Sequence, residues 1–288
     1  MLTLKNTKLT IKINPKGAEL THIIDNKTGQ DFIWNGEEWA KHAPILFPAI
    51  GRSTEDEYLL DGKLYPMQQH GFATDYDFEL LEQRTDFIKL LFKDNPETYQ
   101  SFPFHFEFIV IYKLKDNALN LTFEVKNLTE KSMSFALGFH PAFNLPGKFE
   151  DYQIRFATND KVLKTFDIVK NPFPYRSGKL TTFAQSVSEF SLDRQMFAAG
   201  LVIFDNKINQ IKLSSVLTDY AVSLEMSDFP YLCLWTKEDM TLPYLCIEPF
   251  SGLPDIINQK QELLEKEGNH VLTANEAATY KVKLTFDN

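Results

Sequence analysis

The sequence predicts a mostly β protein, a large antiparallel β-sandwich with few short helices. Three observations support this prediction. Apolar and polar residues alternate with a period of two along many segments, turn-forming residues separate these segments, and helical patterns are scarce. Hydrophobic residues make up 43% of the 288 residues and aromatic residues 14%, with 25 phenylalanines, so the chain can fill a sizeable core. Many strands joined by turns are typical of a sandwich or barrel.

The alternating segments run from the beginning of the chain to its end. Strands are predicted at residues 9–13, 78–82, 87–92, 104–112, 119–125 and 278–286. Residues 104–125 are expected to form a long hairpin with Asp116 and Asn117 at its tip, because these residue types tolerate the positive φ of tight turns. Asp61 and Gly62 predict a similar turn between two shorter apolar segments.

Only two segments carry helical signals. Asn95 and Pro96 suit the cap and the first position of a short helical turn. The charged segment at residues 259–267 predicts a short surface helix that ends at Gly268. No Gly/Ser linker or change in composition divides the chain, so residues 1–288 are expected to form a single domain.

Charge and cysteine content bound the function. The net charge of −9 and a pI of about 5.2, with no basic run, argue against nucleic acid and membranes as partners. Cys233 and Cys246 lie in apolar runs and are expected to be buried, reduced thiols. No segment has the length of a signal peptide or membrane span, so a cytoplasmic location is expected. Nucleotide-binding and zinc-binding motifs are absent from the sequence, so we expect no cofactor and no metal.

Four polar islands interrupt the apolar β pattern with groups that are costly to bury. They lie at residues 43–53, 67–75, 135–143 and 244–255. The first carries Arg52, the second His70 and the third His140. The fourth carries Glu248 directly before Pro249, and because proline cannot donate to a sheet ladder we expect the strand to end there and to project the glutamate.

Each of these residues has a structural explanation as well as a functional one. A lone His140 is more often a hydrogen-bonded core residue than a catalyst, and His70 could be a turn residue before Gly71. Arg52 could pair with the acidic residues just after it, and Glu248 could bond to backbone amides at a strand end. Two histidines, an arginine and a glutamate converging in one cleft would suit acid–base chemistry on a polar, uncharged ligand.

The three tryptophans are a further candidate set. Trp34, Trp39 and Trp235 could stack on the face of a sugar, but core packing is expected for at least two of them.

In this order, the islands resemble the aldose 1-epimerase (galactose mutarotase) family, in particular its LacX-like branch. The matching pieces run over most of the chain: residues 17–20 (GAEL), 43–48 (APILFP), 51–52 (GR), 69–73 (QHGFA), 138–143 (GFHPAF) and 246–249 (CIEP), with Gly252 and Asp255. Any one piece is weak, but the ordered set is fairly specific.

The resemblance implies a galactose-mutarotase-like sandwich with a carbohydrate cleft on one sheet, and interconversion of the α and β anomers of an aldose. Carried over by motif, His140 would be the general acid at the ring oxygen and Glu248 the general base at the C1 hydroxyl. His70 would support the contact near the ring oxygen, and Arg52 would bind sugar hydroxyls.

One position departs from the family pattern. Family members carry a sugar-binding aspartate just before an apolar strand in the third quarter of the chain, and the matching position here is Gly200. Asp193 and Asp205 lie before the segment and at its far end, so neither is a simple substitute. The departure puts the usual substrate set in question while leaving the acid–base pair intact.

Three other functions remain open from the sequence. A hexose-phosphate mutarotase would need basic residues in the cleft, and Arg52 is the only arginine in the four islands, with Lys63 nearby. A non-catalytic carbohydrate-binding or sensing protein is compatible with Gly200, since fold does not fix activity. A glycoside hydrolase usually needs two carboxylates, and Glu248 is the one strong candidate.

Overall fold

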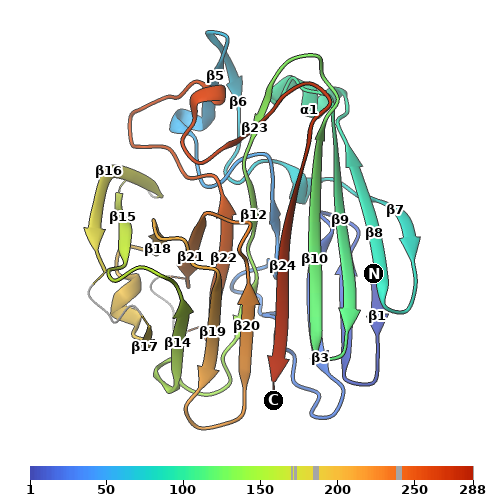
Figure 1. Ribbon diagram of the computed structural model, residues 1–288, viewed down its shortest axis with the longest axis vertical. Helices are drawn as coiled ribbons and strands as arrows, with labels where there is room; N and C mark the ends of the chain where they lie inside the picture. Colours follow the sequence, from blue (N-terminus) through green and yellow to red (C-terminus); the bar gives the residue numbers. More distant parts are fainter. Residues whose placement is uncertain (170, 172–173, 184–187, 238–241, 288) are drawn as a thin grey trace.

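The computed structural model describes residues 1–287 apart from residues 170, 172–173, 184–187 and 238–241. Two large sheets dominate this part of the chain, and every ladder between its strands is antiparallel (Figure 1). The predicted fold class, a mostly β sandwich with few short helices, is confirmed. No helix in the described ranges is long and apolar enough to cross a membrane.

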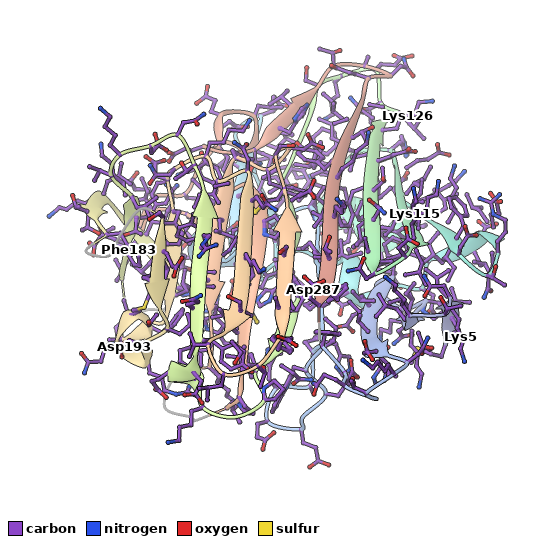
Figure 2. The ribbon with its side chains drawn as sticks, turned by 60° about the horizontal axis from the view of Figure 1, so that its bottom comes forward. Lys5, Lys115, Lys126, Phe183, Asp193 and Asp287 are labelled. Carbon is purple, nitrogen blue, oxygen red and sulfur yellow. The ribbon has the colours of Figure 1, made fainter. Side chains whose placement is uncertain are left out.

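The larger sheet has nine strands. In spatial order they are β17 (Glu189–Ser191), β14 (Tyr152–Ala157), β19 (Gln210–Ser215), β20 (Ala221–Glu225), β24 (Ala277–Asp287), β10 (Ala118–Asn127), β9 (Phe106–Lys115), β8 (Phe87–Lys93) and β7 (Glu79–Gln83). Its outer face is polar, and Figure 2 shows Lys115, Lys126 and Asp287 directed away from the core. Such polar alternation is typical of an antiparallel sheet with one solvated face.

The smaller sheet has eight strands. In spatial order its path is β16 (Tyr175–Thr182), β15 (Lys164–Val169), β18 (Leu201–Phe204), β21 (Tyr231–Trp235), β22 (Tyr244–Ser251), β12 (Leu137–Phe139) and β4 (Ile45–Leu46), and β13 (Ala142–Asn144) also pairs with β22. This sheet carries the candidate site, as described below.

Minor elements complete the fold. They are a sheet of β1 (Leu2–Lys5), β2 (Leu9–Asn14) and β3 (Glu19–Asp25), the pairs β5 (Glu57–Leu60) with β6 (Lys63–Pro66) and β11 (Met133–Phe135) with β23 (His270–Leu272), helix α1 (Pro96–Ser101), and the 3₁₀ turns η1 (Thr54–Asp56), η2 (Ala73–Asp75), η3 (Phe149–Asp151), η4 (Arg194–Phe197) and η5 (Leu263–Glu265).

The core lies between the two large sheets, where side chains of both inner faces meet. Phe106, Phe108 and Val110 point inward from β9 at every second position, as the sequence alternation predicts. Phe47, which follows β4, stacks on Phe108 with ring centroids 4.7 Å apart. The phenylalanine side chains lie mainly in this layer, where each large aromatic ring buries much apolar surface.

The predicted turns and the first predicted helix are confirmed. Asp116, with φ of 53°, lies at the tip of the β9–β10 hairpin, and Asp61 and Gly62 both have positive φ between β5 and β6. Helix α1 begins at Pro96, and the side chain of Asn95 accepts hydrogen bonds from two backbone amides of its first turn. The local chemistry of these residues was enough to predict the conformation.

The helix predicted over residues 259–267 is wrong, because only the single 3₁₀ turn η5 forms there. Tertiary contacts override the helical propensity of the segment. The carbonyl of Gln261 accepts from the amide of Leu59, Lys260 pairs with Glu57, and Lys266 reaches a buried carboxylate described below. One regular helix could not satisfy all of these partners.

The prediction that the strand ends at Glu248 is also wrong, because β22 continues to Ser251. The amide of Ile247 donates to the carbonyl of Pro141. Since successive odd-numbered residues face the same edge of the strand, the nitrogen of Pro249 faces Phe139 at the end of β12, just beyond the last ladder pair of Gly138 with Phe250. Glu248 therefore lies in mid-strand with neighbours on both sides.

The cap of α1 gives a stability prediction. We expect Asn95→Ala to lower the free energy of unfolding by about 1 kcal/mol, because two amide donors lose their acceptor. Chemical denaturation should show a lower midpoint with an unchanged slope. Asn120→Ala on β10 is the control, because its side chain makes one long contact of 3.4 Å. An equal loss in both variants would contradict the assigned cap.

Candidate active site

The outer face of the eight-stranded sheet forms the floor of the candidate site. Along β22, Leu245 and Ile247 point into the sandwich core, whereas Cys246, Glu248 and Phe250 point to the outer face. The period of two along a strand fixes this division. Glu248 is thus a carboxylate on an otherwise apolar floor, 2% exposed.

Strand register places His140 opposite Glu248. In the β12–β22 pair Gly138 lies opposite Phe250, and in the β13–β22 pair Ala142 lies opposite Cys246. The same register carried through the break between β12 and β13 puts His140 across from Glu248. The structure shows this contact, with His140 Nε2 3.2 Å from Glu248 Oε2.

This contact belongs to a straight row across the floor. Cys233 on β21 lies opposite Glu248, and Ile203 on β18 lies opposite Cys233. We call Ile203, Cys233, Glu248 and His140 the site row. Neighbouring strands are about 4.8 Å apart, and the four residues of the row span three such spacings, one after another. The thiol of Cys233 neighbours the Glu248 carboxyl group and partly offsets the rise that burial causes in its pKa.

Burial perturbs both members of the pair. It lowers the pKa of His140 to about 3, with a smaller contribution from the neighbouring His70, and it raises the pKa of Glu248 well above its usual value of 4.5. Burial thus disfavours a charge on either group. Among the described side chains, His140 Nδ1 and Glu248 Oε1 are buried atoms without a hydrogen-bond partner. Unsatisfied polar atoms of this kind are typical of functional sites.

His70 is held next to His140 by backbone contacts. Its amide donates to the carbonyl of Gly51 and its Nδ1 accepts from the Gly51 amide at 3.2 Å. Because Nδ1 is an acceptor, the neutral ring carries its proton on Nε2. Burial lowers the pKa of His70 to about 4, so the ring can present a neutral N–H donor. The ring centroids of His70 and His140 are 5.8 Å apart.

Gly71 explains the loop that carries His70. Its φ is 73°, and an added Cβ would lie 2.3 Å from the carbonyl oxygen of Phe47. A residue with a side chain could not approach the β4 segment this closely, so the position requires glycine. His70 itself has a φ of 67°, so the predicted turn is confirmed, and its side chain also lines the cavity, where its role in substrate binding stays a prediction.

Two tryptophans form an aromatic wall against His140. Trp39 stacks on the imidazole with ring centroids 5.3 Å apart, and Trp235 meets it edge-on at 5.7 Å. Trp34 is buried beneath them, and its Nε1 donates to the carbonyl of Trp39. Trp34 is buried in a hydrophobic cluster, and Trp39 and Trp235 pack against that cluster while half-buried and also line the site.

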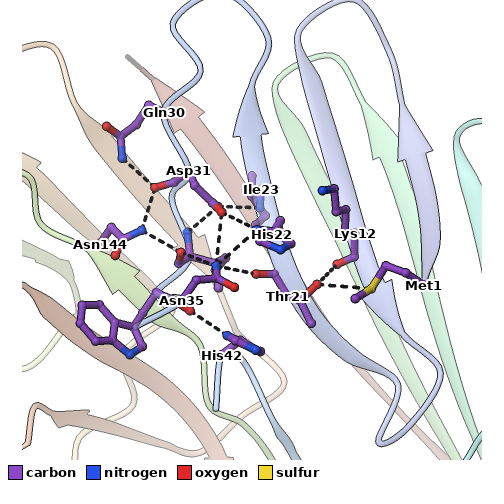
Figure 3. A network of polar contacts seen from close by, with 12 residues as sticks. Met1, Lys12, Thr21, His22, Ile23, Gln30, Asp31, Asn35, His42 and Asn144 are labelled. Atoms are coloured by element: carbon purple, nitrogen blue, oxygen red, sulfur yellow. Dashed lines mark hydrogen bonds and ion pairs between the residues drawn. The ribbon is translucent and has the colours of Figure 1, made fainter. Parts of the chain in front are cut away.

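A polar network anchors the loop that carries Trp39 (Figure 3). Asp31 accepts from the backbone amide of Ile23 and contacts Nδ1 of His22 at 2.6 Å. The side-chain amide of Asn144, at the end of β13, donates to the carbonyl of Asp31. Nδ1 of His42 contacts the carbonyl of Trp34 at 2.9 Å. The network joins β3, the loop and β13, so it ties the loop to the sheet that carries His140.

These groups surround a cavity of about 360 Å³. Its lining residues are Trp39, Lys41, Pro44, Leu46, Gly51, Gln69, His70, Thr74, His140, Pro174, Leu201, Ile203, Cys233, Trp235, Glu248, Phe250 and Pro254. The volume is within the range of small-molecule sites. A mostly apolar lining with a few convergent polar groups is also typical of such sites.

Arg52 is placed beside the cavity and does not line it. Its Nε lies 3.3 Å from Asp56 Oδ1, which matches the ion pair considered from the sequence. The backbone of Gly51, directly before it, does reach the cavity. The structure thus brings His140, Glu248 and His70 together and leaves the role of Arg52 in sugar binding as a prediction.

The sequence analysis missed several lining groups. Lys41 and Gln69 lie at the cavity, and Cys233 contacts the catalytic candidate Glu248 directly. Cys233 could have been found only if it were known which two apolar strands pair with each other. One group in the described chain has the chemistry of metal ligands, since ligand atoms of His140, Cys246 and Glu248 lie within 4.8 Å of one another.

Gly200 lies just before β18, and its backbone excludes the expected aspartate. Its φ is 100°, a conformation in which a residue with a side chain is strained. Leu201 and Ile203 line the cavity from the strand that follows. The backbone conformation at this edge of the site therefore suits the glycine that the sequence has in place of the aspartate.

A buried charge network supports the edge formed by Gly51 and Pro254. Lys266 Nζ lies 2.6 Å from Asp255 Oδ1, with side-chain exposures of 5% and 1%. The other carboxylate oxygen of Asp255 accepts from the amide of Thr54, and the Asp255 amide donates to the carbonyl of Arg52. The Asp255 carboxylate thus joins two chain segments that are 201 residues apart in sequence.

Comparisons with known proteins agree with this geometry. The family model described as aldose 1-epimerase matches residues 1–270. The protein LacX of Lactococcus lactis subsp. lactis is 31% identical over 283 residues, 92% of each chain.

Solved structures show the same similarity. A galactose mutarotase-like protein from Lactobacillus casei ATCC 334 superposes with a TM-score of 0.96 at 37% identity, over 99% of each chain. A galactose mutarotase related enzyme from Lactobacillus acidophilus gives a TM-score of 0.93 at 30% identity, covering 100% of this chain and 97% of the other. Galactose 1-epimerase from Lactobacillus acidophilus NCFM shares the fold, with a TM-score of 0.74 at 15% identity over 99% of this chain and 94% of the other.

The buried ion pair gives the second prediction. We expect Lys266→Met to lower the free energy of unfolding by about 3–5 kcal/mol, because Asp255 then keeps a buried charge without its partner. Lys260→Met is the matched control. Lys260 pairs with Glu55 and Glu57 near the surface, so its loss should cost less than about 1 kcal/mol. Similar losses measured by denaturant titration of the two variants would contradict the burial argument.

Proposed function

We propose that this chain, which belongs to the aldose 1-epimerase family, interconverts the α and β anomers of an unphosphorylated aldose such as glucose or galactose. The observation that carries the proposal is the direct contact between a buried imidazole and a buried carboxyl group on the floor of a cavity. The chemistry needs two such groups close together, because the ring oxygen O5 and the hydroxyl oxygen O1 are bonded to the same carbon.

The reaction moves one proton on each side of the anomeric carbon. Glu248 takes the proton of the C1 hydroxyl while His140 donates a proton to O5, the C1–O5 bond breaks and C1 becomes an aldehyde carbon. Rotation about the C1–C2 bond exposes the other face of the aldehyde. Reclosure returns the protons in reverse and gives the other anomer.

His70 and Arg52 have supporting roles in this proposal. His70 presents its Nε2–H donor near O5, which fits the neutral tautomer set by the Gly51 amide. Arg52 binds sugar hydroxyls at the edge of the cavity. Trp39 and Trp235 offer aromatic faces to the apolar C–H side of the sugar.

Proton counting explains why burial suits the pair. The reactive form has a carboxylate and an imidazolium, and the ring-opened form has a carboxylic acid and an imidazole, so each state holds one proton in total. Proton transfer over the 3.2 Å between Oε2 and Nε2 interconverts the two forms without a change in net charge. Because burial disfavours a net charge, the pair keeps one proton in total, which is the number that the reaction requires.

We also propose that this isomerase needs no cofactor and that residues 1–288 form a single domain. Acid–base catalysis at an anomeric carbon requires no metal and no redox group. The cytoplasmic location stays a prediction from the sequence.

A phosphorylated substrate is less well supported. Among the described lining residues the cavity presents one permanent cation, Lys41, and the nearest arginine, Arg52, is paired with Asp56. Phosphate sites usually use several charge-assisted donors.

The third prediction tests the pair. Glu248→Gln and His140→Gln should each reduce anomerisation by about 10²–10⁴-fold, because each removes one of the two proton-transfer groups while nearly keeping its shape. Polarimetry of freshly dissolved α-D-glucose and α-D-galactose, with and without protein, measures the rate.

The control variant is His105→Gln, a surface histidine whose side chain is 59% exposed. It should anomerise sugar at the wild-type rate. Wild-type rates in either site variant would refute the assigned roles. If the wild-type protein binds sugar saturably but does not accelerate anomerisation, the protein is a sugar sensor and not an enzyme.

The fourth prediction concerns pH. The active state holds one proton on the pair and is lost when a second proton binds or the last one leaves. Since burial lowers the pKa of His140 to about 3, the acid limit set by His140 moves down, and since burial raises the pKa of Glu248, the alkaline limit set by Glu248 moves up. We expect kcat/KM to keep its value at neutral pH down to about pH 5. A limb centred near 6.5, the ordinary value for histidine, would contradict the perturbed pair.

A further inference from the structure

Cys246 adds a third metal-binding side chain to the acid–base pair. It lies two residues before Glu248 on β22, so both side chains point to the outer face of the sheet. Ala142, two residues after His140, lies opposite Cys246 in the β13–β22 pair. A thiol, an imidazole and a carboxyl group thus meet from two segments that are distant in sequence, so no local motif reveals them.

The three ligand atoms are close enough to share one ion. One ligand atom from each of His140, Cys246 and Glu248 can be chosen so that all three lie within 4.8 Å of one another. In a tetrahedral zinc site, with bonds of about 2.0–2.3 Å, ligand atoms are about 3.3–3.7 Å apart. Side-chain movements of about 1 Å therefore bring all three onto one ion.

The cavity gives an ion access from one side. His140 and Glu248 line it, whereas Cys246 is fully buried and lies opposite Trp235. Glu248 Oε1 is buried without a hydrogen-bond partner among the described residues, so this oxygen is free to act as a ligand. An ion held by the three side chains keeps its fourth position toward the cavity, where a water molecule completes a tetrahedral site.

Charge favours a divalent cation. Burial disfavours net charge on His140 and Glu248, which share one proton. Burial also raises the pKa of the Cys246 thiol, so a cation has to displace the thiol proton as well as the shared one. The carboxylate and the thiolate that result carry two negative charges beside a neutral imidazole. A divalent cation cancels both charges and leaves the buried group neutral.

The ligand types favour zinc over magnesium. Thiolate and imidazole are ligands of Zn²⁺, whereas Mg²⁺ prefers six oxygen ligands in octahedral geometry. The group offers one carboxyl group and no further oxygen ligand.

We infer that His140, Cys246 and Glu248 bind a divalent cation of the zinc type, and that the bound ion inhibits anomerisation. The ion takes the place of the proton that the acid–base pair shares, so Glu248 cannot accept a proton from O1 and His140 cannot donate one to O5. The inhibition rests on the proposed function, because it requires that these two groups transfer the protons. The ion is an inhibitor and not a cofactor, so the proposed reaction still needs none.

A zinc titration tests the inhibition. Polarimetry measures anomerisation of α-D-galactose by wild-type protein in a buffer that does not chelate metals, and the rate without protein at the same ZnCl₂ concentration is subtracted. Saturating ZnCl₂ should lower the rate by at least about 10²-fold, because the ion blocks both proton-transfer groups. MgCl₂ at the same concentration should leave the rate unchanged. An unchanged or faster rate with zinc would overturn the inference.

Matched thiol variants test the assignment to Cys246. Cys246→Ala should keep the wild-type rate without metal, because the thiol transfers no proton. It should raise the ZnCl₂ concentration for half-inhibition by more than about 100-fold, since loss of a direct ligand costs more than loss of an outer partner. Cys246→Ser, which nearly keeps the size of the side chain, should lose zinc sensitivity in the same way.

Cys233→Ala is the control, because it removes the other buried thiol of the floor. Measured against its own rate without metal, this variant should keep the zinc sensitivity of the wild type. Wild-type zinc sensitivity in Cys246→Ala, or a loss of sensitivity in Cys233→Ala, would overturn the assigned ligands.

Cobalt binding separates the ion site from the reaction. Co²⁺ accepts the same ligands as Zn²⁺, and its bond to a thiolate gives an ultraviolet charge-transfer absorption. Wild-type protein should show this absorption and Cys246→Ala should not. No such absorption in the wild type would overturn the ion site and leave the proposed function standing. If metal-free wild-type protein does not accelerate anomerisation, the proposed function and the inhibition both fail, and the cobalt absorption still decides whether the ion binds.

Discussion

The site depends on the contact between His140 and Glu248, 3.2 Å apart on the floor of the eight-stranded sheet. Strand register alone brings the two side chains together, because the β12–β22 and β13–β22 pairs share one register across the break between them. His140 lies between the two ladders, and Pro249 lies opposite Phe139, just beyond the last ladder pair of β12 with β22. Burial then disfavours net charge on the pair, so one proton is shared by two groups whose separate pKa values move in opposite directions.

The surroundings hold this pair from several directions. Gly51 fixes the ring of His70 through its backbone, and the ion pair of Lys266 with Asp255 fixes the segment that contains Gly51. On the opposite side the network around Asp31 ties down the loop that carries Trp39. Preorganised groups of this kind suit a reaction whose chemical step is only proton transfer.

Much of the fold followed from sequence pattern. Period-two alternation located the major strands, and the hairpin at Asp116 and the cap at Asn95 were predictable from the conformational preferences of single residues. The helix predicted over residues 259–267 failed because Lys266 is drawn to a carboxylate buried elsewhere in the fold, a contact that no local pattern reveals. For the same reason the end of the strand at Glu248 was misplaced, since the pairing of β22 with β21 and β12 carries the strand past Pro249.

The site was predictable to a similar extent. Motif order identified His140, Glu248 and His70, which the structure brings to one cavity. The wall made by Trp39 and Trp235 and the thiol of Cys233 depend on cross-strand pairing and could not be found along the chain alone. Gly200 was noticed in the sequence as a missing side chain, and the structure adds that its φ of 100° would strain any residue with a side chain at this position.

The most direct test of the acid–base account is magnetisation transfer between the two anomers at chemical equilibrium. Carbon NMR of D-glucose and of D-galactose labelled at C1 measures ring opening and closure without any net change in composition. The account predicts exchange between the α-C1 and β-C1 signals that grows in proportion to the concentration of wild-type protein. Exchange that stays at the spontaneous rate for both sugars, at concentrations where they saturate the cavity, would contradict it.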